Sequence, residues 1–129
     1  MVGEKYELIP SKTTGFFRVK SLRDFSDVKK GDVGGYVTGN HNLSQLDLCW
    51  IYDDAVVSGN ARVSGNARVY GNAEVYGDSK VYGKAVILHY VSICDNAQVF
   101  GDSRVIGFSR VCCYCEVSGN ERILSGTNT

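Results

Sequence analysis

β-Branched aliphatic side chains recur at every sixth residue over more than half of the chain. From Asp47 to Leu124 the sequence divides into thirteen hexads without an insertion. The third place of a hexad is small in nearly every case, Gly dominates the first place, and Asn or Asp dominates the second. A pattern kept in phase over this length indicates a structural repeat. The fifth places are Ile51, Val57, Val63, Val69, Val75, Val81, Ile87, Ile93, Val99, Val105, Val111, Val117 and Ile123.

This period predicts short strands that alternate with tight corners. Places three and five lie two residues apart, so both side chains point to the same face of an extended strand. Gly and Asn at places one and two suit the tightly turned backbone of a corner. Three hexads close one triangular coil, which stacks residues 18 apart at about 4.8 Å. We therefore predict an all-β fold in which residues 47–124 form about four stacked coils around an aliphatic core.

The hexads resemble the motif of the hexapeptide-repeat, left-handed parallel β-helix family, in which a small residue stands two places before each aliphatic one. The resemblance covers residues 47–124. It implies left-handed coiling, although the general rule for parallel crossovers favours the right hand. It also implies the activity of many family members, which are trimeric acyltransferases with a catalytic histidine and an acyl-CoA site between subunits.

Residues 1–46 do not keep the hexad, and residues 125–129 form a short tail. Two strands are expected in the leader, at Lys5–Ile9 and Phe16–Leu22, with a polar loop between them. Phe16, Phe17 and Phe25 are its expected apolar anchors. An open solenoid end needs a cap, so we predict that the leader is a small β cap over the first coil near Trp50 and Ile51. The alternative is a separate recognition module.

A glycine-rich stretch lies within the leader at Gly31–Val37. It lacks the lysine and the strand-then-helix context of a phosphate-binding loop. We predict a turn for it.

Four strings of the leader and the first coil resemble the opening of small hexapeptide-repeat proteins of bacteriophage and prophage genomes. The resemblance implies a phage or prophage origin and a place of action in the cytoplasm of a bacterial host. Small phage proteins of this kind often bind host machinery. The strings are LRDF (22–25), GDVGGYV (31–37), NLSQ (42–45) and CWIYDDA (49–55).

Charge and cysteine usage narrow the classes of partner. The chain of 129 residues has 14 basic and 14 acidic residues, which gives no electrostatic reason for direct binding to nucleic acid or to a membrane surface. No run of 18 apolar residues is present, so we expect no membrane span. Five cysteines are an odd number in a chain without an apolar signal segment, which favours reduced thiols and a cytoplasmic protein.

The acyltransferase alternative depends on His41 and His89, the two histidines of the chain. General-base catalysis needs such a group beside a substrate cleft. His89 takes the glycine place of its hexad and His41 lies in a polar turn, so we expect a structural or solvated role for both. The uninterrupted hexads leave no loop that could build an acceptor pocket. Two histidines are also too few for a three-histidine zinc site.

Cys94 stands 18 residues before Cys112, so stacking of the coils would bring the two thiols within range of a disulfide or a shared metal. Cys49 and Cys115 occupy the small inward place, where a free cysteine acts as a compact apolar residue. We predict structural cysteines, no metal site and no cofactor, with zinc as the alternative.

One outer face of the predicted coils differs from the other two. Its sixth places are large and apolar in every coil, and aromatic, arginine and aliphatic side chains together are typical of interfaces. The sixth places are Tyr52, Tyr70, Leu88, Ile106 and Leu124, and the outward fourth places are Trp50, Arg68, Val86, Arg104 and Arg122.

Three occupants of this face are open: a second copy in a dimer or trimer, a host protein, or the leader folded down over it. We favour self-association, since closed homo-oligomers are the usual way to bury such a face. The sequence thus predicts a non-catalytic binding protein that acts on a host factor, such as an inhibitor of a host-defence nuclease (an anti-CRISPR type). The alternatives are a hexapeptide-repeat acyltransferase and a structural component of a virion.

Overall fold

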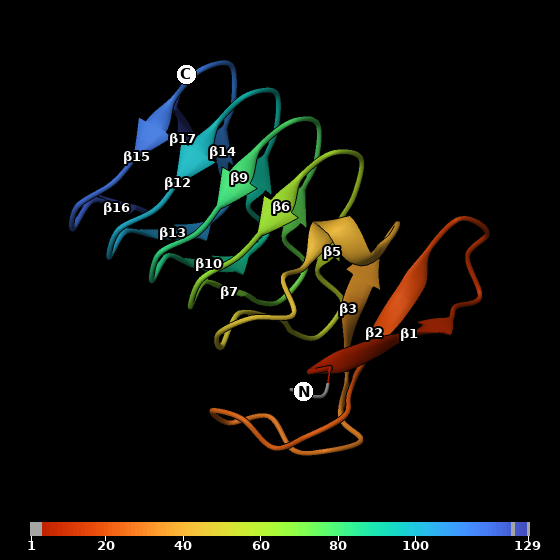
Figure 1. Cartoon of the computed structure of the whole chain (residues 1–129). Coiled ribbons are helices and arrows are strands. Elements are labelled where there is room, and N and C mark those ends of the chain that lie inside the picture. The colour runs from red at the N-terminus through yellow and green to blue at the C-terminus, as the bar shows by residue number, and fades with distance from the viewer. Residues whose placement is uncertain (1–3, 125, 129) are drawn as a thin grey trace.

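The computed structural model describes residues 4–124 and 126–128, and they form an all-β parallel solenoid with a β-hairpin at one end (Figure 1). The predicted β-helix is confirmed. One short 3-10 turn, η1 (Asn40–Asn42), interrupts the strands. The strands are β1 (Tyr6–Pro10), β2 (Phe17–Ser21), β3 (Val33–Val37), β4 (Trp50–Ile51), β5 (Val56–Val57), β6 (Arg62–Val63), β7 (Arg68–Val69), β8 (Glu74–Val75), β9 (Lys80–Val81), β10 (Val86–His89), β11 (Ser92–Ile93), β12 (Gln98–Val99), β13 (Arg104–Gly107), β14 (Ser109–Val111), β15 (Glu116–Val117), β16 (Arg122–Ile123) and β17 (Gly126–Asn128).

Three parallel sheets form the sides of the solenoid. Their orders are β3-β5-β8-β11-β14-β17, β4-β7-β10-β13-β16 and β6-β9-β12-β15. Neighbouring strands pair with an offset of 18 residues, as in Ile51 opposite Val69 and Gln98 opposite Glu116. The predicted stacking distance in sequence is therefore confirmed. Figure 1 shows the coils rising as parallel rows from the N-terminal hairpin to the C-terminal end.

The aliphatic fifth places fill the inside of the solenoid. Twelve of the thirteen are fully buried, and Ile123 in the last coil is half-buried. The small third places pack beside them, as at Ala67 and Ala85, which have no exposed surface. Backbone hydrogen bonds run from coil to coil, so each short strand gains its stability from its neighbours rather than from its own length.

Glycine is required at the corners for two reasons. Gly83 has φ +68, a left-handed value that costs a residue with a Cβ about 1–2 kcal/mol. A Cβ there would also lie 2.8 Å from the backbone nitrogen of Gly101 in the next coil. Four side-chain-bearing residues nevertheless take a corner position with positive φ in this repeat: Asp53, His89, Asp95 and Cys113.

The leader forms the hairpin and then joins the solenoid. β1 and β2 pair antiparallel, which confirms the two predicted strands to within a residue or two. The predicted turn at Gly31–Val37 is wrong, because Val33–Val37 is strand β3, which pairs antiparallel with β2 and parallel with β5. Gly34 and Gly35 are there to let two backbones approach. A Cβ on Gly34 would lie 2.3 Å from the carbonyl oxygen of Ile51.

The stacked coils extend upstream of Asp47. Val37 pairs with Val57 and Leu43 with Val63, at an offset of twenty residues instead of eighteen. With this turn the solenoid has about five turns rather than four. The two additional residues lie between Leu43 and Ile51. The loop there is held by the buried Lys5, whose amine donates to the carbonyl oxygens of Leu46, Asp47 and Cys49 at 3.2, 3.3 and 2.8 Å.

The leader covers the first coil at Trp50, as expected, but with a different set of side chains. Phe25 is buried against the Trp50 ring. Phe16 is half-buried and Phe17 is 38% exposed, so neither is an anchor of the kind predicted. Their place is taken by Tyr6 and by two buried valines of the leader, Val19 and Val28. No helix in the described ranges is long and apolar enough to cross a membrane.

Candidate binding surface

The outward side of β4, β7, β10, β13 and β16 carries the ten residues predicted as an interface. The registers Trp50–Arg68, Val86–Arg104 and Arg104–Arg122 align the fourth places in one column. The structure divides this face into a part that the leader covers and a part that it leaves open.

Trp50 does not belong to an exposed face, which corrects the sequence prediction. It is 2% exposed and packs edge-to-face against Tyr6 and Phe25, with ring centroids 6.2 and 5.3 Å away. Sequence periodicity places Trp50 in the outward column correctly, but it cannot show that another segment lies on top of it.

The leader also binds the second coil through polar contacts. The Tyr52 hydroxyl donates to the Asp27 carboxylate at 2.6 Å, and Arg68 donates to the Ser26 hydroxyl at 2.7 Å. Tyr52 stacks on Tyr70 with centroids 4.2 Å apart. Burial, together with the bond to Asp27, raises the pKa of Tyr52, so the phenol remains a donor at neutral pH. The leader therefore occupies the first two coils of the face.

The later coils of the face are open and apolar. β10 and β13 are four residues long, and their register continues through Leu88–Ile106. Leu88 and Ile106 are half-buried, whereas Leu124 in the next coil is 64% exposed. These three predicted residues form one apolar column.

Two aromatic residues that the sequence analysis did not select extend this column around the corner. Tyr90 is 55% and Phe108 76% exposed, and their rings stack with centroids 5.0 Å apart and nearly parallel. Both stand at the second place of a hexad, which Asn or Asp occupies elsewhere. That departure was a readable signal. We call Leu88, Tyr90, Ile106, Phe108 and Leu124 the apolar patch.

Basic side chains border the apolar patch. Arg104 and Arg122 stand directly opposite each other on β13 and β16, both exposed, and neither forms an ion pair within the described residues. A groove of about 490 Å³ beside them is lined by Arg68, Lys84 and Arg104 and contains no carboxylate. Leu48, Asn66, Tyr70 and Val86 complete this basic groove.

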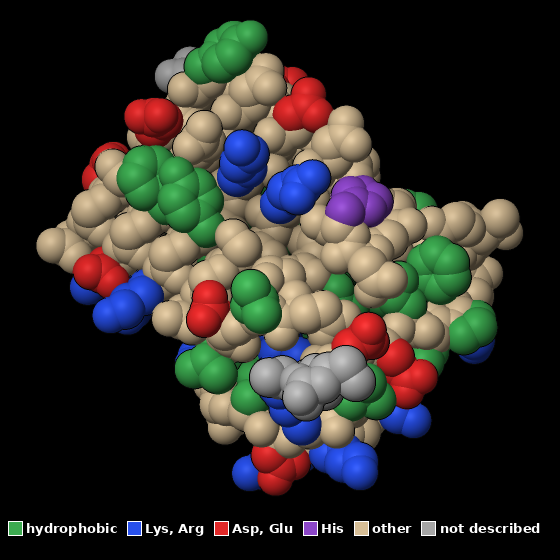
Figure 2. Space-filling view, in the orientation of Figure 1, with side chains coloured by type: hydrophobic (Ala, Val, Ile, Leu, Met, Phe, Trp, Pro, Cys, Tyr) green, Lys and Arg blue, Asp and Glu red, His purple; other side chains and the backbone are tan. Residues whose placement is uncertain are grey.

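The other faces are mixed in character. Figure 2 shows hydrophobic and basic side chains set among polar ones over β6, β9, β12 and β15. Tyr82 and Phe100 stack there, but Ser64 and Ser118 stand at the equivalent places of the coils on either side. A continuous apolar column is thus a property of the face that ends in Leu124.

The two histidines lie at different corners and share no site. His41 Nε2 is 2.8 Å from the carbonyl oxygen of Gly59, so this nitrogen carries the hydrogen and donates. His89 is exposed at the end of β10 with φ 75. A side chain in that conformation stands where the repeat has glycine, as the sequence predicted.

All five cysteines are free thiols. Cys49 is fully buried, as expected for the inward place, and its sulfur lies 3.4 Å from the Lys5 amine. Burial raises the pKa of Cys49 despite this neighbouring cation. Cys94 and Cys112 follow the paired strands β11 and β14 and are both buried.

Comparison with known proteins gives a partial match. No protein-family model matches the chain. A stretch of 52 residues is 38% identical to an uncharacterised acetyltransferase, YdcK, of Escherichia coli strain K12. The match covers 35% of this chain and 16% of that protein. Together with the stacked coils, it is consistent with a hexapeptide-repeat β-helix.

Proposed function

We propose that this protein is a non-catalytic binding protein that acts through protein–protein contacts of the apolar patch and the basic groove. The observation that carries this proposal is the stacked pair Tyr90 and Phe108 beside Leu124, all more than half exposed. A monomer seldom leaves a contiguous apolar surface of this kind bare. Aromatic side chains next to arginines are also the usual composition of binding hot spots.

The same patch is the proposed seam of a homo-oligomer, a dimer or trimer. Arg104 and Arg122 need carboxylates on the opposite surface, because two aligned guanidinium groups repel each other. A foreign partner that carries acidic side chains around an apolar centre meets the same requirement. The two occupants differ in stoichiometry, which a mass measurement separates.

The finer proposal is that the foreign partner is a bacterial host factor, such as a defence nuclease, in the host cytoplasm. It rests on the resemblance of the leader strings to phage and prophage proteins. In the structure those strings build the fold: Phe25 packs on Trp50, and Gly34 lies against Ile51. The resemblance therefore supports common origin more directly than a common partner.

The test uses two substitutions on the patch, Phe108→Asp and Leu124→Asp, made together. Both side chains are exposed, so the fold should tolerate the change. Tyr114→Asp is the matched control, since Tyr114 is 81% exposed at a different corner. Light scattering should give an oligomer for the native chain and the control and a monomer for the double variant, at an unchanged melting temperature. Equal masses for all three, with equal capture of partner from host lysate, would refute the proposal.

A second candidate is acyl transfer, which the partial match to an acetyltransferase favours. His89 is the better base of the two histidines, because it is exposed while His41 donates to Gly59. Calorimetry with acetyl-CoA separates the candidates. Micromolar binding that is lost in His89→Ala would support the enzyme, and absence of heat would support the binding protein.

A further inference from the structure

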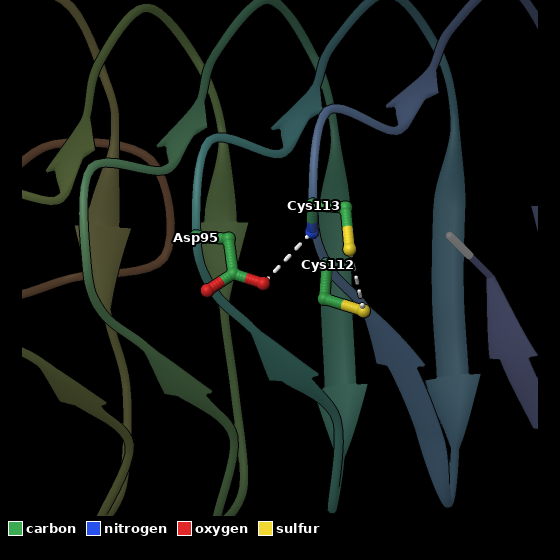
Figure 3. A group of neighbouring side chains, drawn as sticks. All are labelled: Asp95, Cys112 and Cys113. Carbon is green, nitrogen blue, oxygen red and sulfur yellow. Dashed lines mark hydrogen bonds between the residues drawn. The ribbon is translucent and has the colours of Figure 1, made fainter.

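Three potential metal ligands from two successive coils meet at one corner of the solenoid (Figure 3). Asp95 follows β11, and Cys112 and Cys113 follow β14, the strand stacked on β11. One carboxylate oxygen and the two sulfurs all lie within 4.8 Å of one another. Cys112 is buried, whereas Asp95 and Cys113 are exposed, so the cluster opens to solvent on one side.

The spacing of the two sulfurs fits a shared thiophilic ion. Cys112 Sγ and Cys113 Sγ are 3.9 Å apart, with no bond between them. Two thiolates on a tetrahedral zinc ion, each about 2.3 Å from the metal, stand about 3.8 Å apart. The thiols therefore need little movement to bind the same ion.

The carboxylate is already held in position. The Cys113 backbone N–H donates to Asp95 Oδ2 at 2.9 Å, which leaves Asp95 Oδ1 available. Asp53 makes the same bond to the Gly71 N–H at another corner, at 3.1 Å, without a cysteine nearby in that motif. The orientation of Asp95 thus has a structural reason, whereas the two thiols beside it do not follow from that reason.

Cys113 is the residue that the repeat does not explain. The two equivalent corner positions before Asp95 are Gly59 and Gly77, both with positive φ. Cys113 has φ 61, and cysteine has no local hydrogen bond of the kind that lets Asp or Asn adopt this conformation at low cost. Strained positions of this type concentrate at ligand sites.

We propose that Asp95, Cys112 and Cys113 form a binding site for a thiophilic divalent cation of the zinc class, with two thiolates and one carboxylate as ligands. Water completes the coordination on the exposed side. The site ties the corner after β14 to the corner after β11, so the bound ion stabilises the stacking of the C-terminal coils. This differs from the pair Cys94 and Cys112 that the sequence spacing indicated.

The test is a titration of the metal-free, phosphine-reduced full chain with Cd²⁺, followed by the ultraviolet thiolate-to-cadmium charge-transfer absorption, with Zn²⁺ as competitor. The native chain should bind one equivalent and melt at a higher temperature with the metal. Cys113→Gly restores the glycine of the preceding coils. It should bind at least tenfold more weakly, yet melt no lower than the metal-free native chain.

Two further variants make the result specific. Asp95→Asn keeps an acceptor for the Cys113 amide and should still weaken binding, because an amide is the poorer zinc ligand. Cys115→Ser changes a half-buried thiol two residues away, outside the cluster, and should titrate like the native chain. No charge-transfer band in the native chain, or equal titrations of Cys113→Gly and Cys115→Ser, would overturn the proposal.

Discussion

Lys5 offers a direct test of how the leader joins the solenoid. Its amine is fully buried and donates to the carbonyl oxygens of Cys49, Leu46 and Asp47 in the loop that accommodates the two additional residues of the first turn. We expect Lys5→Met to preserve the volume of the side chain and remove all three donors.

The magnitude follows from which carbonyls lose their only partner. The bond to Cys49 is buried, and an unsatisfied buried carbonyl costs about 1–3 kcal/mol. Leu46 and Asp47 are exposed residues, so water can replace the amine there at small cost. Burial lowers the pKa of Lys5, which means that its charge is itself unfavourable in the fold, and the methionine removes that cost. The net destabilisation is about 2 kcal/mol, or about 8 °C in melting temperature at roughly 4 °C per kcal/mol.

The single tryptophan makes the assay local. Trp50 lies between the leader and the first coil, so its fluorescence reports on their contact, while circular dichroism reports on all coils. Urea unfolding of Lys5→Met should shift the fluorescence midpoint to lower denaturant, with Lys12→Met at an exposed position as the control. An unchanged midpoint, or an equal shift in Lys12→Met, would show that the buried amine does not hold the loop.

Two other outcomes follow from the same packing. Since burial and the bond to Asp27 raise the pKa of Tyr52, the unfolded chain loses this proton first, at about pH 10, and stability falls as the pH rises through that value. Tyr52→Phe should flatten the fall in urea midpoint between about pH 9 and pH 11, and an unchanged slope would contradict the assignment. Gly34→Ala forces a Cβ against the Ile51 carbonyl and should cost about 2–3 kcal/mol in urea unfolding. Gly15→Ala, with open space and only a positive φ, should cost about 1 kcal/mol, and equal losses would argue against the close approach.

The coils were predictable because each of them repeats one burial pattern. A valine or isoleucine at the fifth place and a small residue at the third fit only one side of a short strand, and stacking then determines every neighbour. The pairing of Ile51 with Val69 follows from position in the hexad alone. No such repeated constraint acts on the leader.

The leader depends on contacts between residues that are distant in sequence and different in type. Adjacent glycines usually mark a turn, but Gly34 serves the close approach of two strands. A lysine is seldom fully buried, so nothing near Lys5 announces its role. The candidate site was predictable in part for the same reason: the column through Ile106 follows from the period, whereas the cover over Trp50 comes from the leader's own fold.

The constant offset of 18 residues means that the molecule can change length only in whole steps. Deletion of residues 59–76 would join Ser58 to Gly77, which are consecutive places of a hexad, and every remaining strand would keep a partner of the correct register. Such a shortened protein would bring its N-terminal hairpin about 4.8 Å nearer to Phe108 without turning either around the axis. The solenoid therefore works as a ruler, on which the spacing between two surfaces can be adjusted while their directions stay the same.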